Sequence, residues 1–352
     1  MLQKSRTPER IDWMQAYYFS QMSKSERAAY NAMLECFMAC APSWRVPDLG
    51  QRALSDVYAR LKLDHPEIFW VRQYSYRYTE TSDYVDLRPE YSYEKSRVRE
   101  QQKAIDARVT KLLRPILQAG KDEQERFIHS FICQNVRYDK LKKEYSHEVT
   151  GPLTNGVGVC EGMAKTVKLL CDRLGIGCIV VLCEADPEHG IKYRHAWNLV
   201  QMNGTWYHLD ATFDNTLSAC GTERFDYFNL CDEKIYRDHR ASIYPLPACR
   251  DAAGFYYRKA GLSVTKIEDA QKRMQQALRK KQTHCVLHWR GGSLTREVLA
   301  QLLQLAQQTA AARNLQAACS VNLPQSVVCV QFGEKMDERI LEEAAGAGEN
   351  TD

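Results

Sequence analysis

The sequence has no long hydrophobic run, and this absence excludes several classes of protein. No stretch approaches the roughly 18 consecutive apolar residues of a membrane span, and no apolar run follows residues 1–13 as a secretion signal would require. Lysine plus arginine and aspartate plus glutamate nearly balance, at 48 against 44, and both signs are mixed along the chain. We therefore expect a cytoplasmic protein with no membrane partner and no nucleic-acid partner.

The sequence also has no CxxC motif, although the chain has 13 cysteines. They are scattered and odd in number, which favours buried thiols in a reducing compartment over a disulfide framework. Cys183, His189 and His195 have no fourth partner at a familiar zinc-ligand spacing, and no loop has the alternating carboxylates of a calcium site. We expect no structural disulfide, no metal and no cofactor, with a zinc site as the open alternative.

Residues 1–125 are predicted to form a mostly helical region with a tyrosine-rich β-hairpin. Ser23 and Glu26 stand at capping-box spacing before a helix, and a second helix is expected over 47–61, with Pro47 in its first turn. Alternating aromatic residues over 68–91 predict the hairpin, whose tyrosines favour packing on neighbouring helices over ligand stacking.

Two further regions complete the chain. Residues 93–138 are predicted to contain two helices that lead into a central core over 126–262. Residues 263–352 are predicted to form a small α/β unit that ends in a loose acidic tail. Its expected elements are a helix after residue 264, a strand over 283–289, a helix over 293–313 and a strand over 326–332.

One cysteine of the central region stands at the start of a predicted helix, in NGVGVCEGMAKTVKLLCDRLG. Gly156 and Gly158 allow a sharp turn before Cys160, apolar residues then recur at helical spacing, and Gly175 can end the helix. The unpaired N–H groups and the dipole at a helix N-terminus favour a thiolate. Cys160 is therefore a candidate nucleophile, whereas Cys171 in the helix interior is expected to be a core residue.

A hairpin farther along the chain offers a base for this thiol. The Asn-Gly dipeptide at 203–204, between two β-rich segments, predicts a type I′ turn. If Met202 pairs with Thr205, His195 and Asp210 become diagonal neighbours on one sheet face, with Cα atoms about 7 to 8 Å apart. A carboxylate in that position can fix the tautomer of the imidazole and stabilise its protonated form.

Other polar and aromatic residues of this hairpin leave alternatives open. His208 lies on the same face as His195 by parity but four residues away in register, so we assign it a supporting or structural role. Trp197 and Trp206 are candidates for the walls of a substrate pocket, and ordinary core packing is an equal alternative for both.

In combination, these motifs resemble the transglutaminase-like cysteine enzymes. VCEGMA with Cys160, RHAWN with His195 and WYHLDATFD with Asp210 occur in the order found in that family. The resemblance extends to DHPEIFWV and YFNLCDEKIYRDHR, as in longer bacterial proteins that carry this core. It implies an α+β fold with a papain-like core, in which the helix bearing the cysteine packs on an antiparallel sheet.

The resemblance also implies a chemistry: acyl transfer on protein or peptide amides. Cys160 would be the nucleophile, His195 the base and then the acid, and Asp210 the orienting carboxylate. The backbone N–H of Cys160 and a second donor, Gln134 or Tyr138, would hold the oxyanion. Transglutaminase, deamidase and cysteine protease activities share this trio, and the alternative is an inactive transglutaminase-like protein that acts as a binding or scaffold module.

Overall fold

A computed structural model of the chain describes residues 16–78, 82–186, 188, 194–219 and 221–334. They form an α+β protein with two compact units, the first made of Met1–Val181 and Ala196–Met202 and the second of Leu182–His195 and Asn203–Asp352. No helix in the described ranges has both the length and the apolar character needed to cross a membrane. The predicted boundaries at residues 125 and 262 stay predictions.

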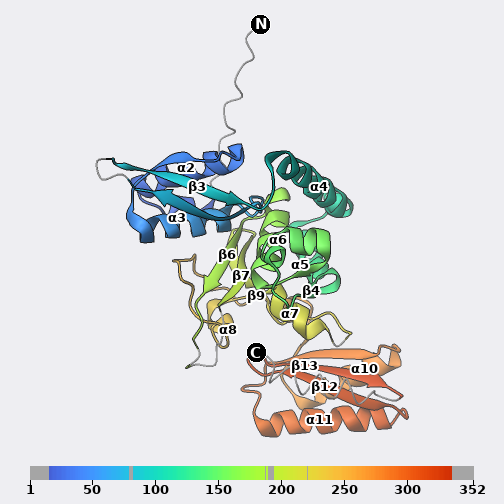
Figure 1. The fold of residues 1–352 in the computed structure, drawn as a ribbon. Helices are drawn as coiled ribbons and strands as arrows, with labels where there is room; N and C mark the ends of the chain where they lie inside the picture. Colours follow the sequence, from blue (N-terminus) through green and yellow to red (C-terminus); the bar gives the residue numbers. More distant parts are fainter. Residues whose placement is uncertain (1–15, 79–81, 187, 189–193, 220, 335–352) are drawn as a thin grey trace. The chain divides into compact units, whose positions relative to one another are not determined.

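The first unit begins with helices beside a three-stranded antiparallel sheet, as Figure 1 shows. The helices are α1 (Tyr17–Ser20), α2 (Lys24–Ala39) and α3 (Gly50–Asp64), and the strands, in the order β1-β3-β2, are β1 (Trp44–Pro47), β2 (Val71–Arg77) and β3 (Tyr84–Tyr91). The predicted capping box is confirmed, because Glu26 N–H donates to the Ser23 hydroxyl and Ser23 N–H donates to the Glu26 carboxylate. The predicted hairpin is confirmed as β2–β3, and its turn residues 79–81 lie outside the described residues.

The prediction that Pro47 opens a helix is wrong. Pro47 ends strand β1 and pairs with Tyr84 of β3. Since β1 is an edge strand, the missing N–H of proline can be accommodated there. The helix starts instead at Gly50, which has a φ of +75° and donates its N–H to the carboxylate of Asp48 at 2.8 Å.

The rest of the first unit carries the cysteine-bearing helix. The two predicted helices are confirmed as α4 (Lys95–Leu113) and α5 (Lys121–Asn135), and the chain continues through β4 (Arg137–Tyr138), β5 (Val157–Gly158), α6 (Cys160–Arg173), β6 (Cys178–Cys183) and β7 (His195–Met202). The end of β6 from Leu182 and the first residue of β7, His195, belong to the second unit. The Asn198 side-chain amide donates to the Ala164 carbonyl at 2.9 Å, and Lys168 Nζ donates to the Cys178 carbonyl at 3.2 Å. These bonds fix α6 against β6 and β7, so the expected packing of the cysteine helix on strands is confirmed.

The second unit continues with β8 (Thr205–Leu209), α7 (Ala211–Ser218), β9 (Phe228–Leu230), α8 (Asp232–Ile235) and α9 (Tyr256–Lys259). Strand β8 pairs antiparallel with β9. The dipeptide before β8 has φ values of +51° at Asn203 and +82° at Gly204. Two consecutive positive φ angles are those of a type I′ turn, so the predicted turn conformation is confirmed.

A second sheet follows in the same unit, in the order β10-β11-β13-β12. Its strands are β10 (Ser263–Val264), β11 (His284–Trp289), β12 (Gln316–Asn322) and β13 (Val327–Gly333), and helices α10 (Ile267–Arg279) and α11 (Arg296–Ala311) share a hydrophobic core with it. The predicted strands at β11 and β13 and both predicted helices are confirmed. The predicted acidic tail beyond residue 334 lies outside the described residues.

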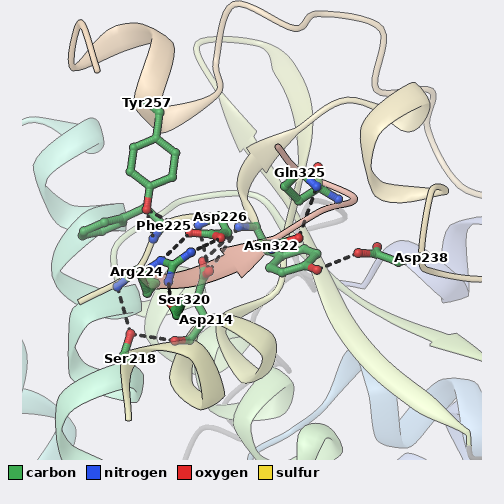
Figure 2. Close-up of polar contacts among 11 residues, drawn as sticks. Asp214, Ser218, Arg224, Phe225, Asp226, Asp238, Tyr257, Ser320, Asn322 and Gln325 are labelled. Atoms are coloured by element: carbon green, nitrogen blue, oxygen red, sulfur yellow. Dashed lines mark hydrogen bonds and ion pairs between the residues drawn. The ribbon is translucent and has the colours of Figure 1, made fainter. Parts of the chain in front are cut away.

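A buried polar cluster joins this sheet to the segment before β9, as Figure 2 shows. Two nitrogens of Arg224 pair with the carboxylate of Asp226 at 2.9 and 2.7 Å, and the third donates to the hydroxyl of Ser320 on β12 at 2.7 Å. The hydroxyl of Tyr257 donates to Asp226 at 2.9 Å. Because Arg224 and Asp226 are almost fully buried, their pairing holds β12 against this segment.

Candidate active site

Cys160 is the first residue of α6, and glycines determine the shape of the chain around it. Gly156 has a φ of +64°, and a Cβ atom on Gly162 would lie 2.1 Å from the carbonyl oxygen of Ser146. The same carbonyl accepts the N–H of Val159 at 3.0 Å. The loop carrying Ser146 therefore lies directly against the first turn of α6, with Cys160 half-buried at its start.

An ion cluster around the buried Lys165 lies in the N-terminal half of α6, and the sequence reasoning missed it. Lys165 Nζ lies 2.8 Å from the carboxylate of Glu161 and 3.1 Å from that of Glu148, which also lies 3.1 Å from Lys62 Nζ. Burial would lower the pKa of Lys165, but the two carboxylates raise it above its usual value. Burial would raise the pKa of Glu161, but Lys165 and His147 hold it well below its usual range.

His195 and Asp210 form a short hydrogen bond in the second unit, as the hairpin argument predicted. His195 Nε2 lies 2.6 Å from Asp210 Oδ2. Asp210 is the N-cap of α7 and is fully buried; its Oδ1 accepts the N–H groups of Thr212 and Phe213 at 2.8 and 3.1 Å. Burial would raise the pKa of Asp210, but His195 and His239 hold it well below its usual range.

His239 is a second histidine on the same carboxylate, and the sequence reasoning did not identify it. Its Nε2 lies 2.9 Å from Asp210 Oδ2, and its Nδ1 lies 2.7 Å from Asp238 Oδ1. Burial would lower the pKa of His239, but hydrogen bonds to these two carboxylates raise it. The ring of Phe213 packs on both imidazoles, at centroid distances of 4.9 Å to His195 and 4.6 Å to His239.

Asp238 extends this arrangement, because its second oxygen lies 2.6 Å from the hydroxyl of Tyr227 (Figure 2). The only sequence signal for Asp238 and His239 was their presence in YFNLCDEKIYRDHR. They follow α8 in a segment without helix or strand, so no periodic pattern marked them as neighbours of Asp210.

The remaining predicted residues fall into different environments. Tyr138 is partly exposed and pairs with Gly158, two residues before Cys160, whereas Gln134 is exposed near the end of α5. His208 is buried, with its Nε2 2.9 Å from the carboxylate of Asp232. Trp197 is buried and Trp206 is half-buried.

Two groups of side chains have the composition of a metal site. His195, Asp210 and His239 form one group, and His208, Asp232 and Cys249 form the other, each with ligand atoms within 4.8 Å of one another. Imidazole, carboxylate and thiolate are zinc ligands. In the first group both imidazoles hydrogen-bond to the Asp210 carboxylate.

Part of the chain is similar to a known protein superfamily. Residues 104–211 match the model of the transglutaminase-like superfamily, and this range includes Cys160, His195 and Asp210. Residues 104–211 are therefore similar to the transglutaminase-like superfamily, and the described residues have an α+β fold.

Two curated relatives are about a quarter identical to this chain over the matched residues and are much longer than it. Mouse kyphoscoliosis peptidase is 25% identical over 170 residues, which are 45% of this chain and 25% of the relative. Human kyphoscoliosis peptidase is 24% identical over 162 residues, which are 42% of this chain and 24% of the relative. The match thus spans about a quarter of each relative's length.

Among solved structures, the crystal structure of a TGase is 13% identical and has a TM-score of 0.27 over 40% of this chain and 44% of that chain. This TM-score is too low to support a structural argument.

Proposed function

We propose that the chain is a cysteine enzyme that cleaves protein or peptide amides by acyl transfer, with Cys160 as nucleophile, His195 as base and acid, and Asp210 as orienting carboxylate. The observation that carries the proposal is the 2.6 Å bond between His195 and a fully buried Asp210. A buried carboxylate held in this way can fix the tautomer and orientation of a catalytic imidazole.

The contacts of Asp210 support this role. One of its oxygens is fixed by two backbone N–H groups and the other accepts His195 and His239. Since these bonds favour the ionised carboxylate, Asp210 can stabilise an imidazolium at His195. Because Nε2 of His195 faces Asp210, the proposal assigns proton exchange with the thiol and substrate to Nδ1.

Cys160 supplies the nucleophile in this proposal. The thiolate attacks the amide carbon, His195 donates its proton to the departing amine, and a thioester on Cys160 remains. Water or an amine then attacks the thioester carbon and gives up a proton to His195, the C–S bond breaks, and the acyl group leaves on the acceptor while the Cys160 thiolate is restored. The N–H of Cys160 provides one oxyanion donor, and we propose Tyr138 ahead of Gln134 for the second because its strand pairs beside the start of α6.

Water is the acceptor that we propose first. Both curated relatives are named peptidases, which favours hydrolysis of a backbone amide over amine transfer. Deamidation and crosslinking use the same residues and differ only in the amide attacked or in the acceptor, so the product distinguishes them.

Mass spectrometry of reaction products tests this proposal. The full chain and its Cys160→Ala variant are incubated with glutamine-containing proteins and peptides, with and without a primary amine. The parent protein should cleave peptide bonds, and the variant should not. Products that Cys160→Ala forms at the parent's rate, or a parent protein that converts no amide although Cys160 is accessible to alkylation, would contradict the proposal and favour a binding role.

A further inference from the structure

The second unit has a cavity of about 80 Å³ that the proposed reaction does not use. Its lining includes three cationic side chains, Lys234 on α8, Arg258 on α9 and Arg290 just after β11, together with the imidazole of His288 on β11. None of the described residues that line it is acidic. A cavity of this size can hold more than one water molecule, so a small ligand fits.

His288 has an unmet hydrogen-bonding requirement inside this cavity. It is 2% exposed, its Nδ1 lies 2.8 Å from the hydroxyl of Ser263, and its ring stands edge-on to Phe255 at a centroid distance of 4.8 Å. Within the described part of the chain, His288 Nε2 is buried and has no hydrogen-bond partner. Leaving such an atom unsatisfied costs about 1–3 kcal/mol.

The strand pattern explains why His288 faces the cavity. Cys285, Leu287 and Trp289 of β11 belong to the core shared with α10 and α11. Side chains alternate between the two faces of a strand, so His288 lies on the opposite face of β11 from this core. The fold thus places a buried imidazole where α8 and α9 contribute their cations to the lining.

Carboxylates act on two cations of this cavity from beyond ion-pair distance, Glu233 on Lys234 and Asp251 on Arg258. No ion pair joins Lys234, Arg258 or Arg290 to any residue in the described ranges, whereas the neighbouring Arg237 pairs with Glu233 at 3.4 Å. Burial and the charges of Arg237 and Arg290 lower the pKa of Lys234. Burial and the surrounding cations lower the pKa of His288 to about 3, so its imidazole is neutral at pH 7.

We propose that this cavity binds a small multivalent oxyanion of the phosphate class, either free phosphate or the phosphoryl group of a monoester. Arginine side chains present paired N–H donors that match phosphate oxygens. The Ser263 hydroxyl lies 2.8 Å from His288 Nδ1 and 3.3 Å from the Tyr257 carbonyl oxygen. When this hydroxyl donates to Nδ1, the neutral His288 ring carries its proton on Nε2, where it can donate to the same anion. One bound dianion would satisfy His288 and offset the repulsion among the three cations.

The site would also connect parts of the second unit. Lys234 and Arg258 come from the short helices after β9, and His288 and Arg290 come from the C-terminal sheet. The side-chain amide of Gln325 already donates to the Lys234 carbonyl at 3.2 Å. A bound anion would therefore stabilise the unit by adding contacts across these segments.

Calorimetric titration of the full chain with inorganic phosphate, at constant ionic strength, tests the proposal. We expect one saturable site, a rise in Tm with phosphate, and weaker binding of acetate. Arg290→Gln and Arg258→Gln should each weaken phosphate binding at least about tenfold. Arg279→Gln, at an exposed position on α10 outside the cavity, makes the same charge change and should leave binding unaltered.

NMR of the His288 ring provides a readout that needs no substitution. Phosphate should shift its Nε2 resonance in step with the calorimetric isotherm. O-phosphoserine that competes with phosphate would assign the site to a monoester, and failure to compete would assign it to free phosphate. Absence of saturable binding to the folded parent protein, or equal affinities in Arg290→Gln and Arg279→Gln, would overturn the proposal.

Discussion

Cys160 and His195 are held in place by different kinds of interaction. Cys160 depends on backbone geometry, because a loop approaches α6 so closely that only glycine fits at position 162. His195 depends on buried side-chain hydrogen bonds that run through Asp210 to His239 and Asp238. Substitutions around Cys160 should therefore act mainly on stability, and substitutions around His195 mainly on protonation.

The largest expected effect is a difference in activity between variants of two buried aspartates, Asp210 at the N-cap of α7 and Asp214 within this helix. Asp210→Asn should slow the reaction of a substrate found by screening by up to about 10⁴-fold, because the amide no longer holds the His195 tautomer. Asp214 accepts the N–H groups of Asp226 and Tyr227 instead, at 2.8 and 3.1 Å, so Asp214→Asn should lower Tm but not the turnover of folded protein. The measurement is kcat/KM per folded molecule. An equal loss in both variants would contradict the claim that Asp210 acts on the reaction whereas Asp214 acts on stability.

On the Cys160 side, the buried ion cluster should give the largest change in stability. Lys165→Met removes the cation that Glu148 and Glu161 share, although Lys62 still pairs with Glu148. Loss of one partner of a buried ion pair costs about 3–5 kcal/mol, and we expect the lower end of this range because Lys62 remains. Lys103→Met, at an exposed position of α4, is the matched control and should change stability by less than about 0.5 kcal/mol. Denaturant unfolding measures both, and similar values for the two variants would refute the role assigned to the cluster.

Gly162→Ala should have the next largest effect on stability. An added methyl group would force the Ser146 carbonyl away from α6, and such overpacking costs about 1–3 kcal/mol, although alanine favours helices. Gly120→Ala, where a Cβ meets nothing within 4 Å, is the control. Because Gly120 is the N-cap of α5, where alanine is less favourable than glycine, this control should cost no more than about 1 kcal/mol. A Gly162→Ala protein as stable as Gly120→Ala would show that the close approach does not constrain the fold.

His239→Gln should give the smallest effect, which depends on pH. The pKa of His239 is raised, so its contribution to stability is present below the unfolded histidine pKa of about 6.5 and is lost as pH rises through the native value. Each pKa unit corresponds to about 1.4 kcal/mol. The difference in unfolding free energy between parent and variant should therefore shrink from pH 6 to pH 9, and a constant difference would contradict the assignment.

Local signals predicted most of the fold and two of the proposed catalytic residues. The capping box, the glycines around α6 and the Asn-Gly turn each specify geometry over a few residues, and the turn brought His195 and Asp210 together correctly. Strand β12 was not predicted, because QAACSVN is rich in alanine and has a single β-branched residue. Residues 316–322 form a strand because they pair antiparallel with β13, although their intrinsic preference for β-structure is weak.

The residues that the sequence did not reveal depend on contacts between distant segments. His239 follows Asp210 by 29 positions, and no periodic pattern links them. Lys62 and Glu148 are likewise joined only in the folded chain. Sequence patterns place charged residues on the surface by default, so buried ion clusters appear only when the tertiary structure is known.

The most direct test of the account is the rate at which iodoacetamide alkylates each cysteine as a function of pH, read by peptide mass spectrometry. Cys40 is a half-buried internal reference, and burial raises its pKa. The account predicts that Cys160 reacts rapidly well below pH 8.5, the approximate pKa of an unperturbed thiol, and loses this reactivity in His195→Ala. A Cys160 that follows the pH dependence of Cys40, or that reacts equally with and without His195, would contradict the proposed pairing of Cys160 with His195.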